Sequence, residues 1–443
     1  MFLENTIHID LLAKIFDILT ICILLIVTLK NITKVMSETK LLVYMVFFVF
    51  YVLPLVLDYV VGYPEYENEL DRGFIVSQLD TATRIVYDLC LLLATWIILS
   101  YKSPKKKSNI VLTNTTLSAV NIMVIVGMFL PLLCALIIRM PTYMIVTPMW
   151  REVFKFVDPP KNYSLVEQID FVGICCCITC LFGKLKNTSF VTKIIAIILL
   201  YINICIEGKR GIIFFSLLCV VLMFLVQMQM GNKERHNIKL NKTFVLWGLF
   251  TVAIAVAMIA ISVNVKAGRG YEEDPTVMYT SLRVDFLRDD RVRFSIFECL
   301  YPDRLKILDY PGQTVWPFFD YIFPVDVFFS KIFDFRRPTY SYYLSSALMG
   351  GGLSVDESFM TPALFGEILS NFSLFGVIVM ALFSIWFIKL IDRYPYPINV
   401  FLIISYCAWQ MYSVGYIMIF LEFTFALCVI YNLKRKKKLN AKI

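Results

Sequence analysis

The sequence predicts an all-α polytopic membrane protein with about eleven spanning helices (roughly 10–12), and three features lead to this class. First, 59% of the 443 residues are hydrophobic and only 17% are charged, which is more apolar surface than a soluble domain of this size needs. Second, the chain contains repeated apolar runs of about 20 residues, the length that crosses a bilayer. Third, Lys and Arg recur in every second connecting loop, as one consistent orientation requires.

The expected spans follow the apolar runs in chain order. The first run has no small-residue cleavage site after it, so we expect it to remain as a helix. The expected spans are residues 10–29, 41–61, 84–100, 117–138, 168–183, 191–206, 211–229, 244–265, 361–388, 397–413 and 415–432. The chain then divides into spans one to eight (1–265), a large loop with short helices (266–360), spans nine to eleven (361–432) and a basic tail (433–443).

Loop charges predict the orientation in the membrane. KNITKVMSETK, YKSPKKKSN, GKLKNTSFVTK, GNKERHNIKLNK and the tail KRKKKLNAK are basic, whereas YPEYENELDRGF between two of them is acidic. Basic loops stay in the cytoplasm, so the amino terminus and the large loop are expected outside and the carboxyl terminus inside. Because much of the net charge of +8 lies in these loops, it does not indicate nucleic-acid binding.

Ionisable side chains gather at the expected outer ends of the spans. Such groups are costly within a membrane and usually face a bundle interior or a watery cavity. Several are expected to end helices in the headgroup layer or to form structural pairs: Asp58, Asp88, Arg139, Asp170 and Lys266. Four are stronger functional candidates, because they lie in a very short loop or between apolar residues: Glu207, Arg210, Glu367 and Glu422.

The stretch FMTPALFGEILSNFSLFG begins the ninth expected span and carries a carboxylate near its start. Helical spacing places Glu367, Ser370 and Asn371 on one face. Gly366, Ser373 and Gly376 would let other helices approach closely. Two interpretations remain open for Glu367: a neutral, hydrogen-bonded group in a helix–helix seam, or a carboxylate at the floor of a cavity open to the outside.

The large loop contains an arginine-rich stretch, YTSLRVDFLRDDRVRFSIFECL. For most of these residues we expect a self-paired, solvated helix. One or two of the arginines, Arg283, Arg288, Arg291 and Arg293, would instead turn inward to hold phosphates, for which the guanidinium fork is well shaped. Arg269, between glycines in KAGRGYEEDP, is placed to reach an anionic ligand at the membrane surface.

Several kinds of chemistry have no sequence signal here. The chain has no Gly-rich phosphate loop and no Asp-x-Asp pair for a divalent metal, so we expect neither a metal nor a cofactor. Its cysteines lie mostly in apolar runs, where cysteine behaves as a small hydrophobe, so structural zinc and disulfides are not expected. His8 and His236 are the only histidines, and the second falls in an expected cytoplasmic loop.

The order of these motifs resembles the Wzy-type oligosaccharide repeat-unit polymerases, which build O-antigen and capsular polysaccharide in the bacterial inner membrane. The resemblance is carried by a short outer loop with KRG, a long outer loop with YPGQT, and GG followed by GEILSNFSLFG. It covers residues 207–376 best. It implies a metal-independent glycosyltransferase whose donor is a growing glycan on undecaprenyl pyrophosphate and whose acceptor is one repeat unit on a second such lipid.

The resemblance also implies roles for individual residues. Arg210 would neutralise the departing pyrophosphate, and Glu367 would act as general base on the acceptor hydroxyl or orient a neighbouring arginine. Further contacts with pyrophosphate or glycan would come from Lys209, Arg269, Arg283, Arg288, Arg291, Asn371 and Glu422. Besides the lipid bilayer and the lipid-linked oligosaccharides, expected partners are a chain-length regulator and a flippase.

Three alternatives stay open. An O-antigen ligase would transfer the finished glycan to lipid A core, but that family's outer-loop histidine has no counterpart here. A transporter of lipid-linked sugar or polysaccharide would show two related halves with interrupted helices near the midplane, and no such repeat is visible. A cell-wall glycan polymerase would use similar chemistry, but its motifs are not found.

Overall fold

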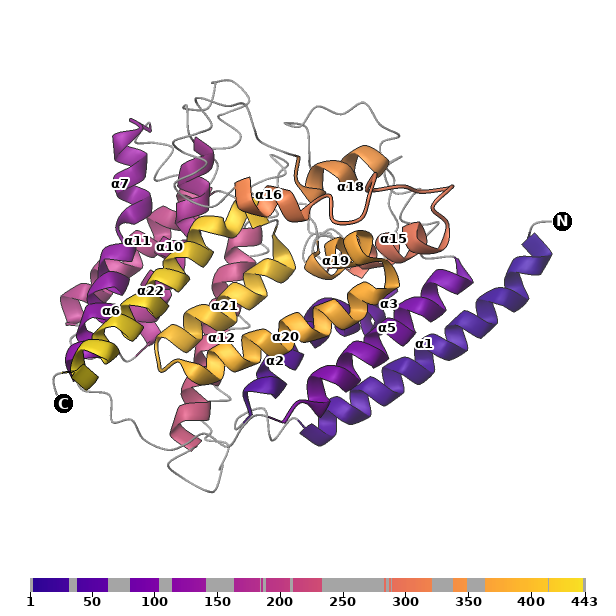
Figure 1. Cartoon of the computed structure of the whole chain (residues 1–443), viewed down its shortest axis with the longest axis horizontal. Coiled ribbons are helices and arrows are strands. Elements are labelled where there is room, and N and C mark those ends of the chain that lie inside the picture. The colour runs from indigo at the N-terminus through magenta and orange to yellow at the C-terminus, as the bar shows by residue number, and fades with distance from the viewer. Residues whose placement is uncertain are drawn as a thin grey trace. The chain divides into compact units, whose positions relative to one another are not determined.

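The structure is a computed structural model, and all regular elements in its described part are helices, with no strand (Figure 1). It describes residues 3–31, 38–62, 80–102, 114–140, 163–183, 185, 189–207, 210–232, 283, 287, 289–320, 338–348, 363–412 and 414–440.

Six helices in the described part are long and apolar enough to cross a membrane, or up to seven if a bent pair counts as one span. The six contain α1 (Leu3–Asn31), α2–η2–α3 (Thr39–Phe47, Phe48–Val52, Leu53–Val60), α5 (Thr81–Ser100), α10 (Tyr163–Phe182), α19–η5–α20 (Leu364–Phe372, Ser373–Phe375, Gly376–Arg393) and α22 (Val414–Asn440). The bent pair comes from α6 (Asn114–Gly127) and α7 (Leu130–Ile137). The chain is therefore a helical membrane protein.

The helices agree with most of the expected spans, although the expected number of about eleven is larger than the number shown. Three apolar stretches, Phe190–Ile206, Phe215–Gln227 and Ile398–Met411, are shorter than the six; they belong to α11 (Phe190–Glu207), α12 (Arg210–Asn232) and α21 (Ile398–Met411). The expected span 244–265 lies outside the described residues. Every other expected span overlaps one of these helices.

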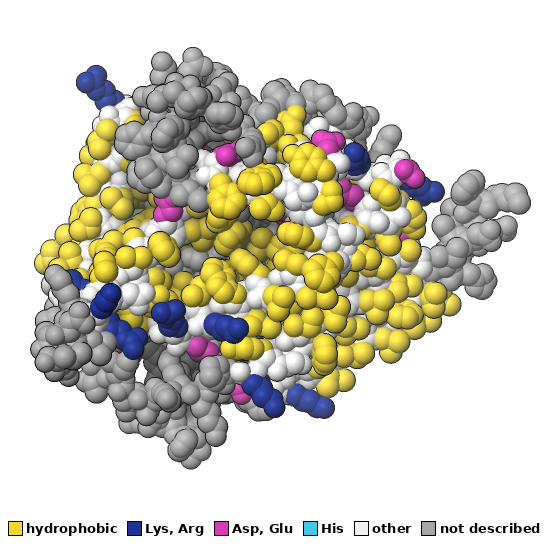
Figure 2. All heavy atoms as spheres, viewed as in Figure 1, with side chains coloured by type: hydrophobic (Ala, Val, Ile, Leu, Met, Phe, Trp, Pro, Cys, Tyr) yellow, Lys and Arg dark blue, Asp and Glu magenta, His cyan; other side chains and the backbone are white. Residues whose placement is uncertain are grey.

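The first helix shows why these elements belong in a bilayer. On α1, Leu11, Ile18 and Leu29 are 56%, 49% and 65% exposed, and hydrophobic side chains cover the face where α1 and α5 lie (Figure 2). A continuous apolar face of this kind is unfavourable in water and favourable against lipid. The opposite side of α1 packs along α5, as the two parallel ribbons in Figure 1 show.

The chain forms two compact units, and three of the boundaries between them fall within helices α20, α21 and α22. Unit 1 comprises residues 1–104, 279–389 and 406–415, and unit 2 comprises 105–278, 390–405 and 416–443. In unit 2, α10 packs against α6, α7, α11 and α12. Cys175, Cys176 and Cys177 are fully buried on α10, consistent with their expected role as small hydrophobes.

Unit 1 contains three short helices between α12 and α19 in the chain: α15 (Asp289–Leu300), α16 (Val315–Asp320) and α18 (Tyr340–Leu348). We call these helices and the loop 301–314 the cap. The cap has a hydrophobic core of its own, made by Phe294, Ile307, Leu308, Tyr340 and Leu344. The large loop is thus more than a connector, because part of it folds around buried apolar side chains.

The cap packs against α19 and α5 through α15. Gly366 is the point of closest approach, since a Cβ there would lie 2.8 Å from the carbonyl oxygen of Arg291. The expectation that Gly366 allows close packing is correct, and its neighbour is the cap helix α15. Gly376 is crowded as well, but by Ile368 and Leu369 of the preceding helix, because the chain bends at Ser373, where φ is +54°.

Replacing Gly366 by Ala is expected to destabilise the protein by about 1–3 kcal/mol, because backbone atoms of α15 would have to move. Helix propensity alone would favour Ala by about 1 kcal/mol, so the sign of the change is diagnostic. The measurement is thermal unfolding in detergent. Phe372→Ala, at an exposed position of the same helix, is the control and should change stability by less than about 0.5 kcal/mol; a more stable Gly366→Ala would contradict the close approach.

Candidate functional site

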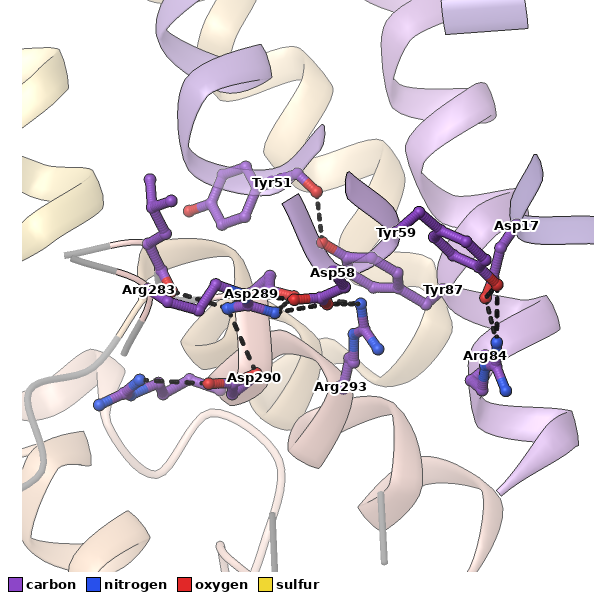
Figure 3. A network of polar contacts seen from close by, with 12 residues as sticks. Asp17, Tyr51, Asp58, Tyr59, Arg84, Tyr87, Arg283, Asp289, Asp290 and Arg293 are labelled. Carbon is purple, nitrogen blue, oxygen red and sulfur yellow. Dashed lines mark hydrogen bonds and ion pairs between the residues drawn. The ribbon is translucent and has the colours of Figure 1, made fainter. Parts of the chain in front are cut away.

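The cap is joined to a spanning helix by a buried arginine (Figure 3). Arg283 is fully buried, and its Nε and Nη2 each donate to the carboxylate of Asp58 on α3 at 2.7 Å. Its Nη1 donates to Asp289 at 2.6 Å and to the carbonyl of Leu287 at 3.4 Å, and its Nη2 donates to Asp289 at 3.1 Å. A guanidinium has five N–H donors, so this geometry leaves none for a phosphate. We infer that Arg283 attaches the cap to the spanning helices.

Arg283 belongs to a cluster with equal numbers of positive and negative groups. Arg293 lies 3.2 Å from Asp289 and 3.6 Å from Asp58, and its guanidinium stands over the ring of Tyr87 on α5 at 4.9 Å. Asp58 therefore does more than end a helix in the headgroup layer. The cluster consists of Arg283, Arg291 and Arg293 with Asp58, Asp289 and Asp290.

The expectation for this arginine-rich stretch is half correct. Its charges do pair with one another, but the helix is not solvated: Asp289 to Glu298 are all buried. Charges without solvent need partners, which explains the dense pairing. Burial, and then the neighbouring Asp289, raise the pKa of the Asp290 carboxyl to about 6, although Arg283, Arg291 and Arg293 act in the opposite direction.

A second buried pair links three spanning helices, and we did not predict it from the sequence. Asp17 on α1 is 2% exposed and accepts hydrogen bonds from Arg84 on α5 and from Tyr59 on α3, the latter at 2.6 Å (Figure 3). Arg84 also donates to the hydroxyl of Tyr59 at 3.0 Å. The sequence did contain an indication of this pair, because Asp17 lies within the apolar run LLAKIFDILTICILLIVTL. A charged residue in a spanning helix usually has a partner.

The carboxylate of Glu367 lies in the first turn of α19, where a negative charge suits the helix dipole. Glu367 is half-buried and hydrogen-bonds the side chain of Thr314 from the cap. Asn371, one turn further along α19, holds the same threonine: its Oδ1 accepts from the Thr314 N–H at 3.2 Å, and its Nδ2 donates to the Thr314 hydroxyl at 2.6 Å. Two segments separated by about fifty residues thus meet at one carboxylate.

The YPGQT motif explains how Thr314 reaches this position. Gln313 N–H donates to the carbonyl of Tyr310 at 3.3 Å, and Gly312 has φ +80°. Pro at the second and Gly at the third position are the residues that a type II turn favours, since its third position needs a φ of about +80°. Before the turn, Glu298 accepts hydrogen bonds from the N–H groups of Ile307 and Leu308 at 2.7 and 3.0 Å, so the loop is held at both ends.

A chain of hydroxyl groups runs beside Glu367. The Tyr340 hydroxyl lies 2.7 Å from Ser295 Oγ on α15 and 2.9 Å from Ser370 Oγ on α19. Burial raises the pKa of Tyr340, and the charges of Glu298 and Glu367 act in the same direction. The hydroxyl therefore stays protonated and can only take part as a neutral donor and acceptor. Tyr340 is 1% exposed, so its ring packs in the core of the cap while its hydroxyl connects α15 and α19.

The other expected site residues are placed as follows. Arg291 is buried and pairs with Asp290 at 3.8 Å, while Asn371 is 3% exposed and engaged with Thr314. Arg210 begins α12 and Glu422 lies on α22, both in unit 2, whereas Glu367 belongs to unit 1. Three lie outside the described residues: Lys209, Arg269 and Arg288.

The site brings together the Glu367 carboxylate, the Thr314 hydroxyl and the side-chain amide of Asn371. Among the described side chains, no group of three or more His, Cys, Asp or Glu is arranged to hold a metal ion. Comparisons with protein-family models, curated proteins and solved structures found no match for this chain.

Replacing Asp290 by Asn is expected to stabilise the protein above about pH 6 by at most about 3 kcal/mol. The pKa in the fold, about 6, lies above the ordinary value of 3.8, so the fold binds more protons than the unfolded chain between these values. Stability therefore falls as pH rises through this window and stays lower above it. The amide of the Asp290→Asn variant does not titrate, so this variant should not lose stability as pH rises. The measurement is the free energy of unfolding in detergent at several pH values across the window.

The matched control is Asp289→Asn, because Asp289 holds Arg283 at 2.6 Å whereas Asp290 lies 3.7 Å from it. Breaking a buried pair leaves an uncompensated charge and destabilises by about 3–5 kcal/mol. Equal destabilisation by the two variants would contradict the assignment of Asp289 as the close partner of Arg283 and of Asp290 as a carboxyl whose charge costs stability.

Proposed function

We propose that this protein is a membrane glycosyltransferase that polymerises lipid-linked oligosaccharide repeat units at the outer face of the bacterial inner membrane. It would transfer the growing glycan from undecaprenyl pyrophosphate to an incoming repeat unit on a second undecaprenyl pyrophosphate. The product would be O-antigen, capsule or a related polysaccharide. The large loop and the amino terminus would be periplasmic and the carboxyl terminus cytoplasmic.

The observation that supports the proposal best is the meeting of two motifs at Glu367. YPGQT and GEILSN were the separate elements of the resemblance, and they come together where Thr314 contacts Glu367 and Asn371. A plain seam between spanning helices does not need a folded cap whose loop ends on the carboxylate.

In the proposed reaction, Glu367 takes the proton of the acceptor hydroxyl. The oxygen of that hydroxyl forms a bond with the anomeric carbon of the donor glycan, and the bond from this carbon to the pyrophosphate oxygen breaks. Undecaprenyl pyrophosphate leaves with the bonding electron pair. Pyrophosphate is a good leaving group, so the protein needs to supply a base, orientation and positive charge.

The positive charge would come from Arg210 and its surroundings. Arg210 is the first residue of α12, and the free N–H groups and dipole at a helix start favour anions. Lys209 and Arg269, together with Arg288, remain further candidates for pyrophosphate or glycan contacts. Arg283 is not one of them in this proposal, because its donors are used by Asp58 and Asp289.

The test is to delete the gene in its host and restore it as wild type, Glu367→Gln or Glu38→Gln, with surface polysaccharide analysed on a gel. Glu38 precedes α2 and pairs with Lys40 at 3.3 Å with a 43% exposed side chain, so it is a carboxylate control outside the site. We expect wild type and Glu38→Gln to restore a ladder. Glu367→Gln, at an equal protein level, should leave only the single repeat, because general-base catalysis typically contributes about 100- to 10,000-fold.

Other outcomes favour other functions. Loss of all surface glycan in the deletion strain, including the single repeat, would favour a transporter or ligase. A full ladder from Glu367→Gln would return Glu367 to the interpretation as a hydrogen-bonded group in a packing seam.

A further inference from the structure

Thr314 occupies an unusual place beside Glu367, because its hydroxyl and its backbone N–H face the same helix. The hydroxyl hydrogen-bonds the Glu367 carboxylate and receives a hydrogen bond from Asn371 Nδ2 at 2.6 Å. Thr314 is only 5% exposed. Thr314 ends the YPGQT motif, but we predicted no role for it from the sequence.

The direction of these hydrogen bonds follows from two backbone groups, one of which can only donate and the other only accept. The Thr314 N–H can only donate, so it fixes the Asn371 oxygen on its side at 3.2 Å. The Glu367 carbonyl can only accept, and it receives Asn371 Nδ2 at 2.8 Å. These two contacts fix which atom of the Asn371 side-chain amide is oxygen and which is nitrogen. The atom that faces the Thr314 hydroxyl is therefore Nδ2, which can only donate.

The Thr314 hydroxyl has one proton, and its oxygen is already an acceptor for Asn371. Its proton is therefore free for the neighbouring carboxylate, which has only acceptor oxygens when ionised. Hydrogen bonds to a charged acceptor are shorter and stronger than neutral ones. The arrangement thus aims one donor at one oxygen of Glu367.

We propose that Thr314 is a positioning residue, which holds one carboxylate oxygen of Glu367 so that the other oxygen faces the acceptor hydroxyl. Asn371 fixes the Thr314 hydroxyl and is itself a positioning residue rather than a ligand for glycan. This inference rests on the proposed function, because it assigns Thr314 a role only through the base Glu367.

The loop around Thr314 is built to hold a hydroxyl in place. The Pro311–Gly312 turn precedes it directly, and Glu298 fixes the segment before the turn. On the other side, α16 begins at Val315. A donor on such a rigid support can orient a carboxylate with small loss of freedom, which is what catalytic geometry requires.

The experiment uses the full chain in lipid nanodiscs with lipid-linked repeat units as substrate, and compares Thr314→Val with Thr314→Ser. Val keeps the shape and lacks the hydroxyl, whereas Ser keeps the hydroxyl and lacks the methyl group. We expect Thr314→Val to lower kcat by about 10- to 100-fold with KM within about threefold. Thr314→Ser should retain kcat within about threefold of wild type.

Folding is checked by the unfolding midpoint, and Thr314→Ala replaces Thr314→Val if the latter does not accumulate. Unchanged kcat in the variant without the hydroxyl would overturn the proposal. So would equal loss in Thr314→Ser, since the methyl group would then matter, or a rise in KM alone. If wild type forms no polymer, the proposed function itself fails; an active wild type with inactive Glu367→Gln and normal Thr314→Val refutes only the positioning role.

Discussion

The contact of Arg283 with Asp58 and Asp289 is the interaction on which the described arrangement of unit 1 depends. Asp58 belongs to a spanning helix, whereas Asp289 begins the first helix of the cap. Taking three cations and three anions out of water costs several kcal/mol per ion unless each has partners. The cap therefore has few low-energy placements other than the one in which these charges meet.

That placement has consequences along the chain. With α15 fixed at its start, its backbone lies against Gly366 of α19. The loop that follows α15 is held by Glu298, turns at Gly312 and ends with Thr314 beside Asn371. The position of Glu367 therefore follows from the charge cluster around Arg283, from the close approach of α15 at Gly366 and from the turn at Gly312.

The sequence predicted what depends on local spacing and missed what depends on contacts between distant residues. Span positions follow from apolar runs, and the shared face of Glu367 and Asn371 follows from the helical period. Asp58 and Arg283 are separated by 225 positions, and no periodicity relates them. Thr314 was missed for the same reason, since its importance comes only from the helix it meets 57 residues later.

The central claim is that Asp58 and Arg283 attach the cap to the spanning helices, and a double-mutant cycle tests it directly. Unfolding free energies would be measured for wild type, Asp58→Asn, Arg283→Met and the double variant. The account predicts a coupling energy of about 1–3 kcal/mol, as expected for residues in one buried ion-pair network. A coupling near zero, with the two single effects simply adding, would contradict it.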